Sequence, residues 1–356
     1  MPAFTCPHGS PAVESSIKHF LWCNSGLVRA VSGQPSQQPV RRTGSLLQAG
    51  RVGAWWLVLL LVSGASVAQQ ANDHYILWQE VAQVDREFSR AATERGRTEA
   101  FLEVLAEDSV LFRDGPVDAR ALYERNQSSY SLDQLYWRDH YIDVSRAGDL
   151  GVTVGPNRFT AIQPGQNGEE GQQTYSYLVN VWRRIEAQWR LVADMVVTVP
   201  GFLSMDVEAD YEDTLAAMEE TAHPGLAVNN TVESLAEADN TLGLSINFRG
   251  GQRAMIRFGL QNLRVYLPGM APGVGMEAAS AAYGKYLDSR VTTVNPIRVE
   301  HRGGFLAESR ELGYTYGVMS TTNVGNSSGF RANYLRVWRF SPVNEWKVAM
   351  EFLRPF

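Results

Sequence analysis

The chain has 356 residues, of which 44% are hydrophobic and 20% charged, and its formal net charge at pH 7 is −6. This length allows two or three domains, and the acidic balance argues against a nucleic acid or an anionic membrane as the partner. Both cysteines, Cys6 and Cys23, lie near the start, so the rest of the chain has no disulfide, thiolate nucleophile or cysteine metal ligand.

The beginning of the chain is expected to lie outside the folded domains. Residues 1–50 are rich in Ser, Gly, Gln and Pro, which is typical of a disordered extension, and their length suggests a start codon assigned too far upstream. Residues 51–68 combine a basic residue, a short apolar run and a small-residue end, the pattern of a secretory signal peptide. The run 55–68 is shorter than the about 20 apolar residues of a membrane span. We therefore expect cleavage near Ala68, export to the periplasm or the medium, and no stable membrane anchor.

The chain after Ala68 carries 27 basic and 37 acidic side chains, a net charge of −10. A first domain is predicted over residues 75–200, and it opens with helices. Apolar residues recur every three or four positions over residues 76–91, which indicates an amphipathic helix that Gly96 ends. A second short helix, a strand over residues 109–112, a turn and a helix capped by Asp118 follow.

Strands are predicted for the remainder of this domain. The pattern changes to period two, with turn residues between the alternating segments, which are 134–146, 150–162, 173–186 and 188–198. Helices followed by an antiparallel run indicate an α+β domain with its helices on one face of the sheet. Residues 201–232 are strongly acidic and predict a solvated linker or helix.

The same pattern then returns, which predicts a second, more divergent domain over residues 233–356. Seven positions recur 154 residues later without a gap: Gly96, Phe101, Leu102, Asp108, Leu111, Phe112 and Gly115 return as Gly250, Met255, Ile256, Asn262, Val265, Tyr266 and Gly269. The helical half of the second copy is rich in glycine, which weakens helices, whereas its strand half keeps its aromatic residues.

Three motifs carry a resemblance to a known family: Gly96-x-x-x-Ala100-Phe101-Leu102-x-x-Leu105-Ala106-x-Asp108-Ser109-Val110, Gly148-Asp149-Leu150-Gly151-x-Thr153-x-Gly155 and Val181-Trp182-Arg183-Arg184-x-x-x-x-Trp189-Arg190. They resemble the nuclear transport factor two-like (NTF2-like) superfamily, which includes ketosteroid isomerase, scytalone dehydratase and the SnoaL-like polyketide cyclases. The resemblance is greatest to the exported SnoaL-like branch.

The resemblance implies two tandem cone-shaped α+β domains. In each, about three helices pack on a curved, mostly antiparallel sheet that leaves an apolar pocket at its open end. Members of the family usually pair through their sheets, so the two domains are expected to pair with each other, or the chain to form a homodimer.

The residues of ketosteroid isomerase are not reproduced. In that enzyme a carboxylate base, a tyrosine and a protonated aspartate act on a ketone. The matching positions hold Arg113 or Asp114, Ser89 and Asn180, and in the second copy the position of Asn180 holds Arg336. Steroid isomerisation is therefore not expected.

Candidate catalytic residues lie in the segment 136–141, which is dense in aromatic and polar side chains. Period two divides it into two rows, Tyr136, Arg138 and His140 on one face and Trp137, Asp139 and Tyr141 on the other. If the first row faces the pocket, His140 is a candidate acid or base near neutral pH. If the second row does, Asp139 is the candidate base. Either row would equally suit a domain interface.

Other candidates come from the strands and their turns. Asn180 could hydrogen-bond a ligand carbonyl or satisfy a strand edge, and Asp114 suits either a pocket mouth or a turn. Asp194, which recurs as Glu351, is expected to form an ion pair with a nearby arginine such as Arg183 or Arg190. The residues predicted to contact a ligand are Trp137, Tyr136, Tyr141, Asp114 and Trp182.

No cofactor or metal is expected. The four histidines after residue 68 have no ligand spacing, and the sequence has no phosphate loop, dinucleotide fingerprint or nucleophile elbow. Three functions remain open. The first is an exported protein that binds a small apolar or aromatic molecule in its first domain. The second is a lyase, isomerase or cyclase-like enzyme with Asp139 or His140 as base and Asn180 polarising a carbonyl. The third is a structural or assembly module without catalysis.

Overall fold

The computed structural model describes residues 52–126, 134–161, 172–212, 214, 230–292, 294–322 and 329–356, and the side chains of these from residue 73 onwards. The predicted extension 1–50 therefore lies outside the described residues, as do residues 213 and 215–229 of the predicted linker. Within the described part of the chain, no helix is both long and apolar enough to cross a membrane.

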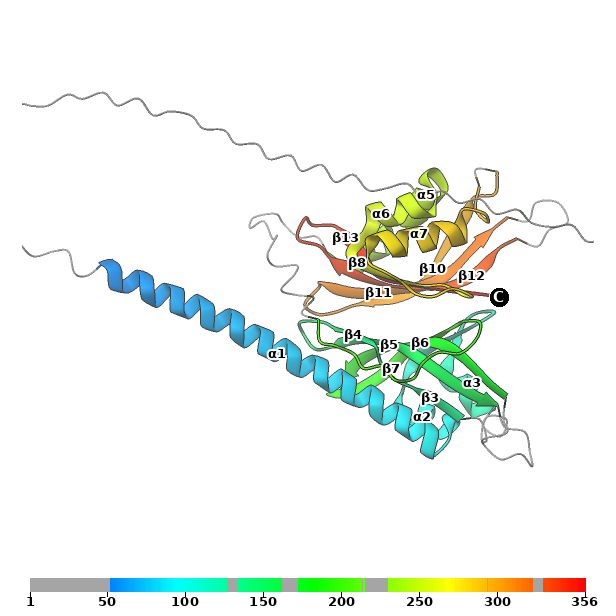
Figure 1. Ribbon diagram of the computed structural model, residues 1–356, viewed down its shortest axis with the longest axis horizontal. Coiled ribbons are helices and arrows are strands. Elements are labelled where there is room, and N and C mark those ends of the chain that lie inside the picture. The colour runs from blue at the N-terminus through cyan, green and yellow to red at the C-terminus, as the bar shows by residue number, and fades with distance from the viewer. Residues whose placement is uncertain are drawn as a thin grey trace, which may run out of the picture. The chain divides into compact units, whose positions relative to one another are not determined.

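The first domain begins with helices, as predicted, and ends with strands (Figure 1). Its elements are α1 (Val52–Glu94), α2 (Arg97–Val104), β1 (Leu105–Arg113), β2 (Gly115–Asp118), α3 (Ala119–Arg125), β3 (Gln134–Trp137), β4 (Tyr141–Val144), β5 (Leu150–Ala161), β6 (Gln172–Ile185) and β7 (Gln188–Thr198). Asp118 caps α3, as expected, because its side chain accepts a hydrogen bond from the backbone N–H of Ala121 at 2.8 Å.

The second domain repeats this plan. Its elements are α5 (Val232–Arg249), α6 (Gly251–Phe258), β8 (Gly259–Tyr266), β9 (Gly273–Val274), α7 (Met276–Leu287), β10 (Ile297–Leu306), β11 (Leu312–Thr321), β12 (Arg331–Phe340) and β13 (Trp346–Pro355). Helix α5 starts with a capping box, in which the side chains of Thr231 and Ser234 bond each other's backbone N–H.

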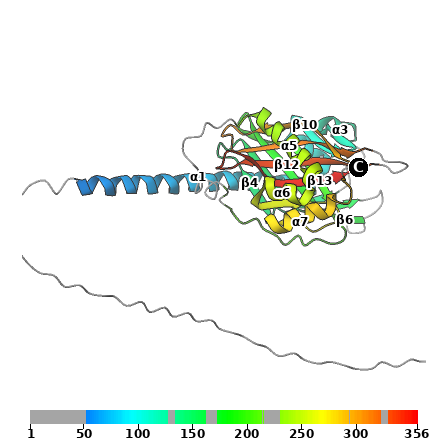
Figure 2. The same ribbon diagram turned by 90° about the horizontal axis from the view of Figure 1, so that it is seen from above.

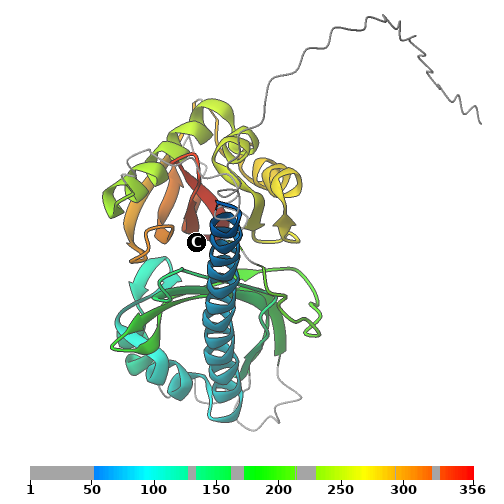
Figure 3. The same cartoon turned by 90° about the vertical axis from the view of Figure 1, so that its left-hand side faces the viewer.

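The two sheets have the same construction. The first has the strand order β2-β1-β7-β6-β5-β3, with β4 also paired to β5, and the second has the order β10-β11-β12-β13-β8-β9. The pairs β1–β7 and β8–β13 are parallel, and the other pairs are antiparallel. The sheet of the first domain curves around α1 (Figure 3). The α+β class and the two tandem domains with mostly antiparallel sheets are confirmed.

The predicted strand 134–146 is divided into β3 and β4, which corrects the sequence-based expectation. Between them the chain passes so close to Gly155 that an added Cβ there would lie 1.7 Å from the carbonyl oxygen of Arg138. The interruption shifts the alternation by one residue, so Ile142 packs towards α1 while Tyr141 faces the second domain. Tyr141 therefore does not share a face with Trp137 and Asp139.

The two sheets pack against each other through an apolar layer. This layer includes side chains from both domains, among them Val152, Val179, Val181, Ala193 and Met195 of the first and Tyr266, Leu335, Val337, Met350 and Phe352 of the second. The helices of each domain pack on one face of its own sheet (Figure 1 and Figure 2). One face of the first sheet contributes to this shared apolar layer, and helix α1 packs on its other face. The candidate site lies on the α1 side of the sheet.

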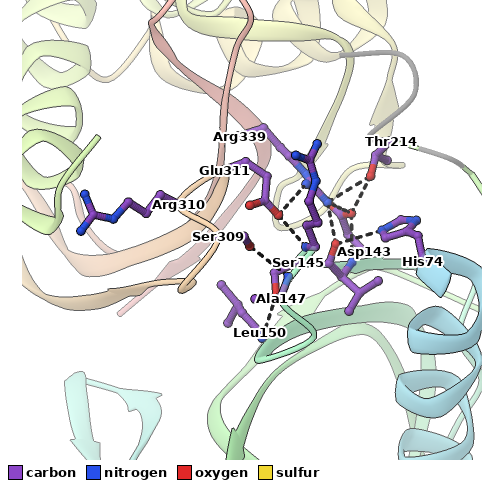
Figure 4. Close-up of polar contacts among 12 residues, drawn as sticks. His74, Asp143, Ser145, Ala147, Leu150, Thr214, Ser309, Arg310, Glu311 and Arg339 are labelled. Atoms are coloured by element: carbon purple, nitrogen blue, oxygen red, sulfur yellow. Dashed lines mark hydrogen bonds and ion pairs between the residues drawn. The ribbon is translucent and has the colours of Figure 1, made fainter. Parts of the chain in front are cut away.

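A buried polar contact also joins the two domains (Figure 4). Arg339 of β12 donates to the carboxylate of Asp143, to the carbonyl oxygen of Val144 at 2.9 Å and to the hydroxyl of Thr214 at 3.0 Å. Both charged side chains are almost fully buried, at 1% and 2% exposure. Because the cation and the anion come from different domains, separating the domains would leave each of them unpaired.

Candidate functional site

A cavity lies between α1, the segment from Tyr136 to Ile142, and the chain that follows β7. Its volume is about 540 Å³, within the range of small-molecule sites. Its apolar and aromatic wall is formed by Trp78, Ala82, Tyr136, Trp137, Ile142, Val207 and Ala209. Its acidic end holds two carboxyl groups, Asp85 of α1 and Asp139.

Asp85 is 1% exposed and accepts hydrogen bonds from uncharged donors only. Its Oδ1 accepts from the hydroxyl of Thr153 at 2.7 Å, from the amide of Asn180 at 2.8 Å and from the indole N–H of Trp182 at 3.0 Å. Its Oδ2 accepts from the indole N–H of Trp137. Four hydrogen-bond donors from the described residues thus converge on this one carboxyl group.

Asp139 faces the carboxyl group of Asp85. Burial raises the pKa of Asp139 well above its ordinary value, and the charge of Asp85 and a hydrogen bond with Asp85 raise it further, while Arg86 opposes the rise. The Oδ1 atom of Asp139 is buried and receives no hydrogen bond from the described residues. Asp139 therefore favours its protonated form more than an ordinary aspartate does.

The second domain contains the same carboxylate in a different setting. Asp239, 154 residues after Asp85, is fully buried and is ion-paired with Arg336, which stands at the position of Asn180. Arg336 also pairs with Glu351 at 2.5 Å, and Tyr334 donates to Asp239. His301 stands at the position equivalent to that of Asp139. Each of these two residues follows a residue whose backbone carbonyl oxygen lies against the equivalent glycine of the sheet. The Nδ1 atom of His301 lies 3.4 Å from Asp239.

This second set of contacts leaves Asp239 fully charged and enclosed. Burial opposes ionisation, but Arg336, His301 and Tyr334 hold the pKa of Asp239 below its ordinary value. The guanidinium group of Arg336 occupies the interior with no exposed surface. The two copies therefore differ at the site, with an open carboxyl pair in the first domain and a closed ion cluster in the second.

The predicted site residues Tyr136, Trp137 and Asp139 line the cavity. Asn180 and Trp182 lie behind it, where their N–H groups donate to Asp85. The amide donor of Asn180, which was expected to contact a ligand carbonyl, thus orients a carboxylate instead. Trp182 has no exposed surface and is not among the residues that line the cavity.

The remaining predicted site residues lie elsewhere. His140 packs at the domain contact, where its Nε2 is 2.9 Å from the hydroxyl of Tyr266, and burial with the charge of Arg264 lowers its pKa to about 4. Tyr141 lies beneath the guanidinium of Arg264, 3.9 Å from the ring centre. Asp114 is exposed between β1 and β2 and does not line the cavity. His140 is therefore not placed to act on a ligand held in this cavity.

Asp194 does not form the ion pair expected of it. Among the described residues Arg183 pairs with Asp108 at 3.6 Å, and Arg190 donates to the carbonyl oxygen of Glu103 and to Gln188. Asp194 is buried with its Oδ2 unpartnered in the described structure, and burial raises its pKa to about 6. It is not among the residues that line the cavity.

Asp85 is the residue that the sequence-based prediction missed. It lies on the apolar face of α1, four residues after Val81 and three before Phe88, both of which are buried. A charged residue on the buried face of a helix is an unusual feature that signals a role. The internal repeat strengthens that signal, because the same residue type returns as Asp239 at the common spacing.

The chain after β7 closes one side of the cavity. Val207, Glu208 and Ala209 line it, and Tyr211 fixes this segment on α1 by a 2.8 Å hydrogen bond between its hydroxyl and Nδ1 of His74. The ring of Tyr211 also packs edge-on against Trp78, with the ring centres 5.9 Å apart. This segment therefore forms a wall of the site although it has no regular secondary structure.

Among the described residues, no group of three or more His, Cys, Asp or Glu side chains is arranged to hold a metal ion. The side chains of the site can themselves interact with a bound molecule. Asp139 can exchange a proton with Asp85 or with a bound molecule, and the aromatic wall can pack against an apolar one.

Comparison with protein-family models and with curated protein sequences finds no match. Solved structures do resemble parts of the chain. A ketosteroid isomerase-like protein from Erwinia carotovora atroseptica is 19% identical, with 35% of this chain and 98% of that chain covered and a TM-score of 0.30. A putative calcium/calmodulin-dependent protein kinase type II association domain from Thiobacillus denitrificans is 14% identical, with 37% and 99% covered and a TM-score of 0.30.

An NTF2-like superfamily protein from Salmonella enterica serovar Typhimurium is 16% identical, with 37% of this chain and 96% of that chain covered and a TM-score of 0.30. Each match spans about a third of this chain and nearly all of the other protein. At these identities and TM-scores no ligand or reaction is carried over to this chain.

Proposed function

We propose that the first domain binds a small, largely apolar or aromatic molecule in the cavity between α1, β3 and residues 207–209. The observation that supports this most directly is the carboxyl pair at the cavity wall, where Asp139 retains hydrogen-bonding capacity that the described residues do not use. Buried polar groups are nearly always satisfied in native proteins, so a group left open in a cavity favours a ligand there.

The second domain is proposed to have a structural role. Its equivalent interior is filled by Arg336 and its partners, and its sheet supports that of the first domain through the shared apolar layer. For the protein as a whole we propose export, on the basis of the signal-peptide pattern of residues 51–68. Binding would then take place in the periplasm or outside the cell.

The binding proposal can be tested with N-phenyl-1-naphthylamine, an uncharged aromatic probe whose fluorescence rises in apolar surroundings. We expect saturable binding of one probe per chain. Val207→Trp, which places a bulky side chain at the cavity wall, should abolish it, whereas Val343→Trp, at an exposed turn of the second domain, should leave it unchanged. Absence of saturable binding, or equal binding by both variants, would contradict the proposal.

A second candidate function is a proton-transfer enzyme of the lyase, isomerase or cyclase class. The raised pKa of Asp139 favours it, because a carboxyl group whose pKa is raised towards the working pH is better suited to act as a general acid or base. Native mass spectrometry separates the two functions. A molecule that Asp139→Asn retains unchanged and the wild-type protein converts indicates an enzyme, and the same unchanged molecule in both indicates a binding protein.

A further inference from the structure

We propose that the ligand is amphiphilic, with a hydroxyl or N–H group at one end and an anionic group at the other. This inference rests on the proposed binding function and specifies the class of molecule. The donor end would contact Asp139 inside the cavity, and the anionic end would lie at the mouth beside Arg86, Arg90 and Arg138.

The requirement for a donor follows from the state of the carboxyl pair. The four donors around Asp85 occupy both of its oxygens, so little capacity remains there for a ligand. The Oδ1 atom of Asp139, by contrast, is buried at the cavity and has no hydrogen-bond partner among the described residues, so it can accept from a donor on a bound molecule. A ligand with only acceptors, such as a ketone or an ether, would leave Asp139 unsatisfied.

The requirement for an anion follows from the charges at the mouth. Three arginines and two glutamates also line the cavity, and their side chains are exposed or partly exposed, as expected near an opening: Arg86, Arg90, Arg138, Glu94 and Glu208. Arg138 meets Glu208 by a single 3.3 Å contact between side chains that are 39% and 85% exposed, which is a weak interaction.

The other two arginines, Arg86 and Arg90, have few polar partners among the described residues. Arg86 donates to Gln83 at 3.1 Å on its own helix, and Arg90 has no hydrogen bond or ion pair within the described structure. Both lie on α1 one turn apart, on the side that lines the cavity, where they could bind one carboxylate or phosphate together.

The apolar wall of the cavity determines which chemical group suits the central part of the ligand. Trp78, Tyr136 and Trp137 offer aromatic surfaces, and Ala82 and Ile142 complete the lining. Ser89 and Thr93 also face the cavity but donate to backbone carbonyls, Ser89 to that of Trp137 at 2.8 Å. An aromatic or alicyclic body is therefore the best match.

Four matched probes test this inference by competition with N-phenyl-1-naphthylamine. 4-Hydroxyphenylacetate has both ends, 4-methylphenylacetate lacks the donor, 2-(4-hydroxyphenyl)ethanol lacks the anion, and 1-ethyl-4-methylbenzene lacks both. We expect the first to bind tightest. Loss of the donor should weaken binding about fivefold and loss of the anion about tenfold, the usual values for a neutral and a charge-assisted hydrogen bond.

Charge variants supply the control. Arg86→Gln with Arg90→Gln should reduce the affinity for the two carboxylates and leave that for the alcohol unchanged, whereas Arg298→Gln with Arg302→Gln, exposed on β10, should change neither. If the hydrocarbon competes as well as 4-hydroxyphenylacetate, the ligand class is wrong while the binding function stands. If neither the naphthylamine nor any of the four probes binds, both proposals fail.

Discussion

Replacement of Asp85 by asparagine is expected to lower the free energy of unfolding by about 3–5 kcal/mol. The NH₂ group of the asparagine would face hydrogen-bond donors that now bond a carboxylate oxygen. Trp137 and Trp182 can only donate, and both are directed at Asp85. Asparagine has one acceptor oxygen where aspartate has two, so at least one buried indole N–H loses its partner. Urea unfolding monitored by tryptophan fluorescence measures the difference.

Asp139→Asn is the matched control for this prediction. Its amide can donate to Asp85 as the protonated acid does, so we expect a change below about 1 kcal/mol. Asp85 would then be required for stability and Asp139 replaceable in the fold. Equal loss in the two variants would contradict the different roles assigned to Asp85 and Asp139.

Arg336→Met is expected to destabilise the protein by a similar amount, about 3–5 kcal/mol. It removes the cation between Asp239 and Glu351, both fully buried, and leaves two carboxyl groups without a counter-ion. Chemical unfolding at pH 7 measures the loss. The effect should be smaller at lower pH, where protonation of the two carboxyl groups removes their charge.

Removing all three charges together should recover part of this stability, since neutral side chains of similar volume carry no uncompensated charge. The variant Asp239→Asn, Arg336→Met, Glu351→Gln is therefore expected to be more stable than Arg336→Met alone. The ion cluster would have no structural role if Arg336→Met unfolded at the same urea concentration as the wild-type protein.

Much of the fold could be predicted from the sequence because the repeat and the periodicities are local patterns. The amphipathic face of residues 76–91, the cap at Asp118 and the alternating strands all depend on near neighbours in the chain. The break between β3 and β4 could not be predicted in this way. It depends on the approach of Arg138 to Gly155, a contact between two strands that only the folded sheet creates.

The candidate site was predictable in part. Asp139 was among the expected candidates, but the period-two pattern did not distinguish it from His140 and Tyr141 as a residue that faces the pocket. Only the shifted alternation in the folded sheet places Asp139 at the cavity and the other two at the domain contact. Its partner Asp85 comes from a distant helix, so no local pattern joins the two. The substitution of Asn180 by Arg336 between the copies is visible in the sequence, but its effect on the second interior appears only in the structure.

The central claim is that Asp139, beside Asp85 in an open cavity, has a raised pKa. ¹³C NMR titration of the aspartate carboxyl carbons tests it most directly, with Asp139→Asn identifying the signal. We expect the carboxyl carbon of Asp139 to titrate well above the ordinary aspartate pKa of about 3.9. Titration of Asp139 near that ordinary value would contradict the account.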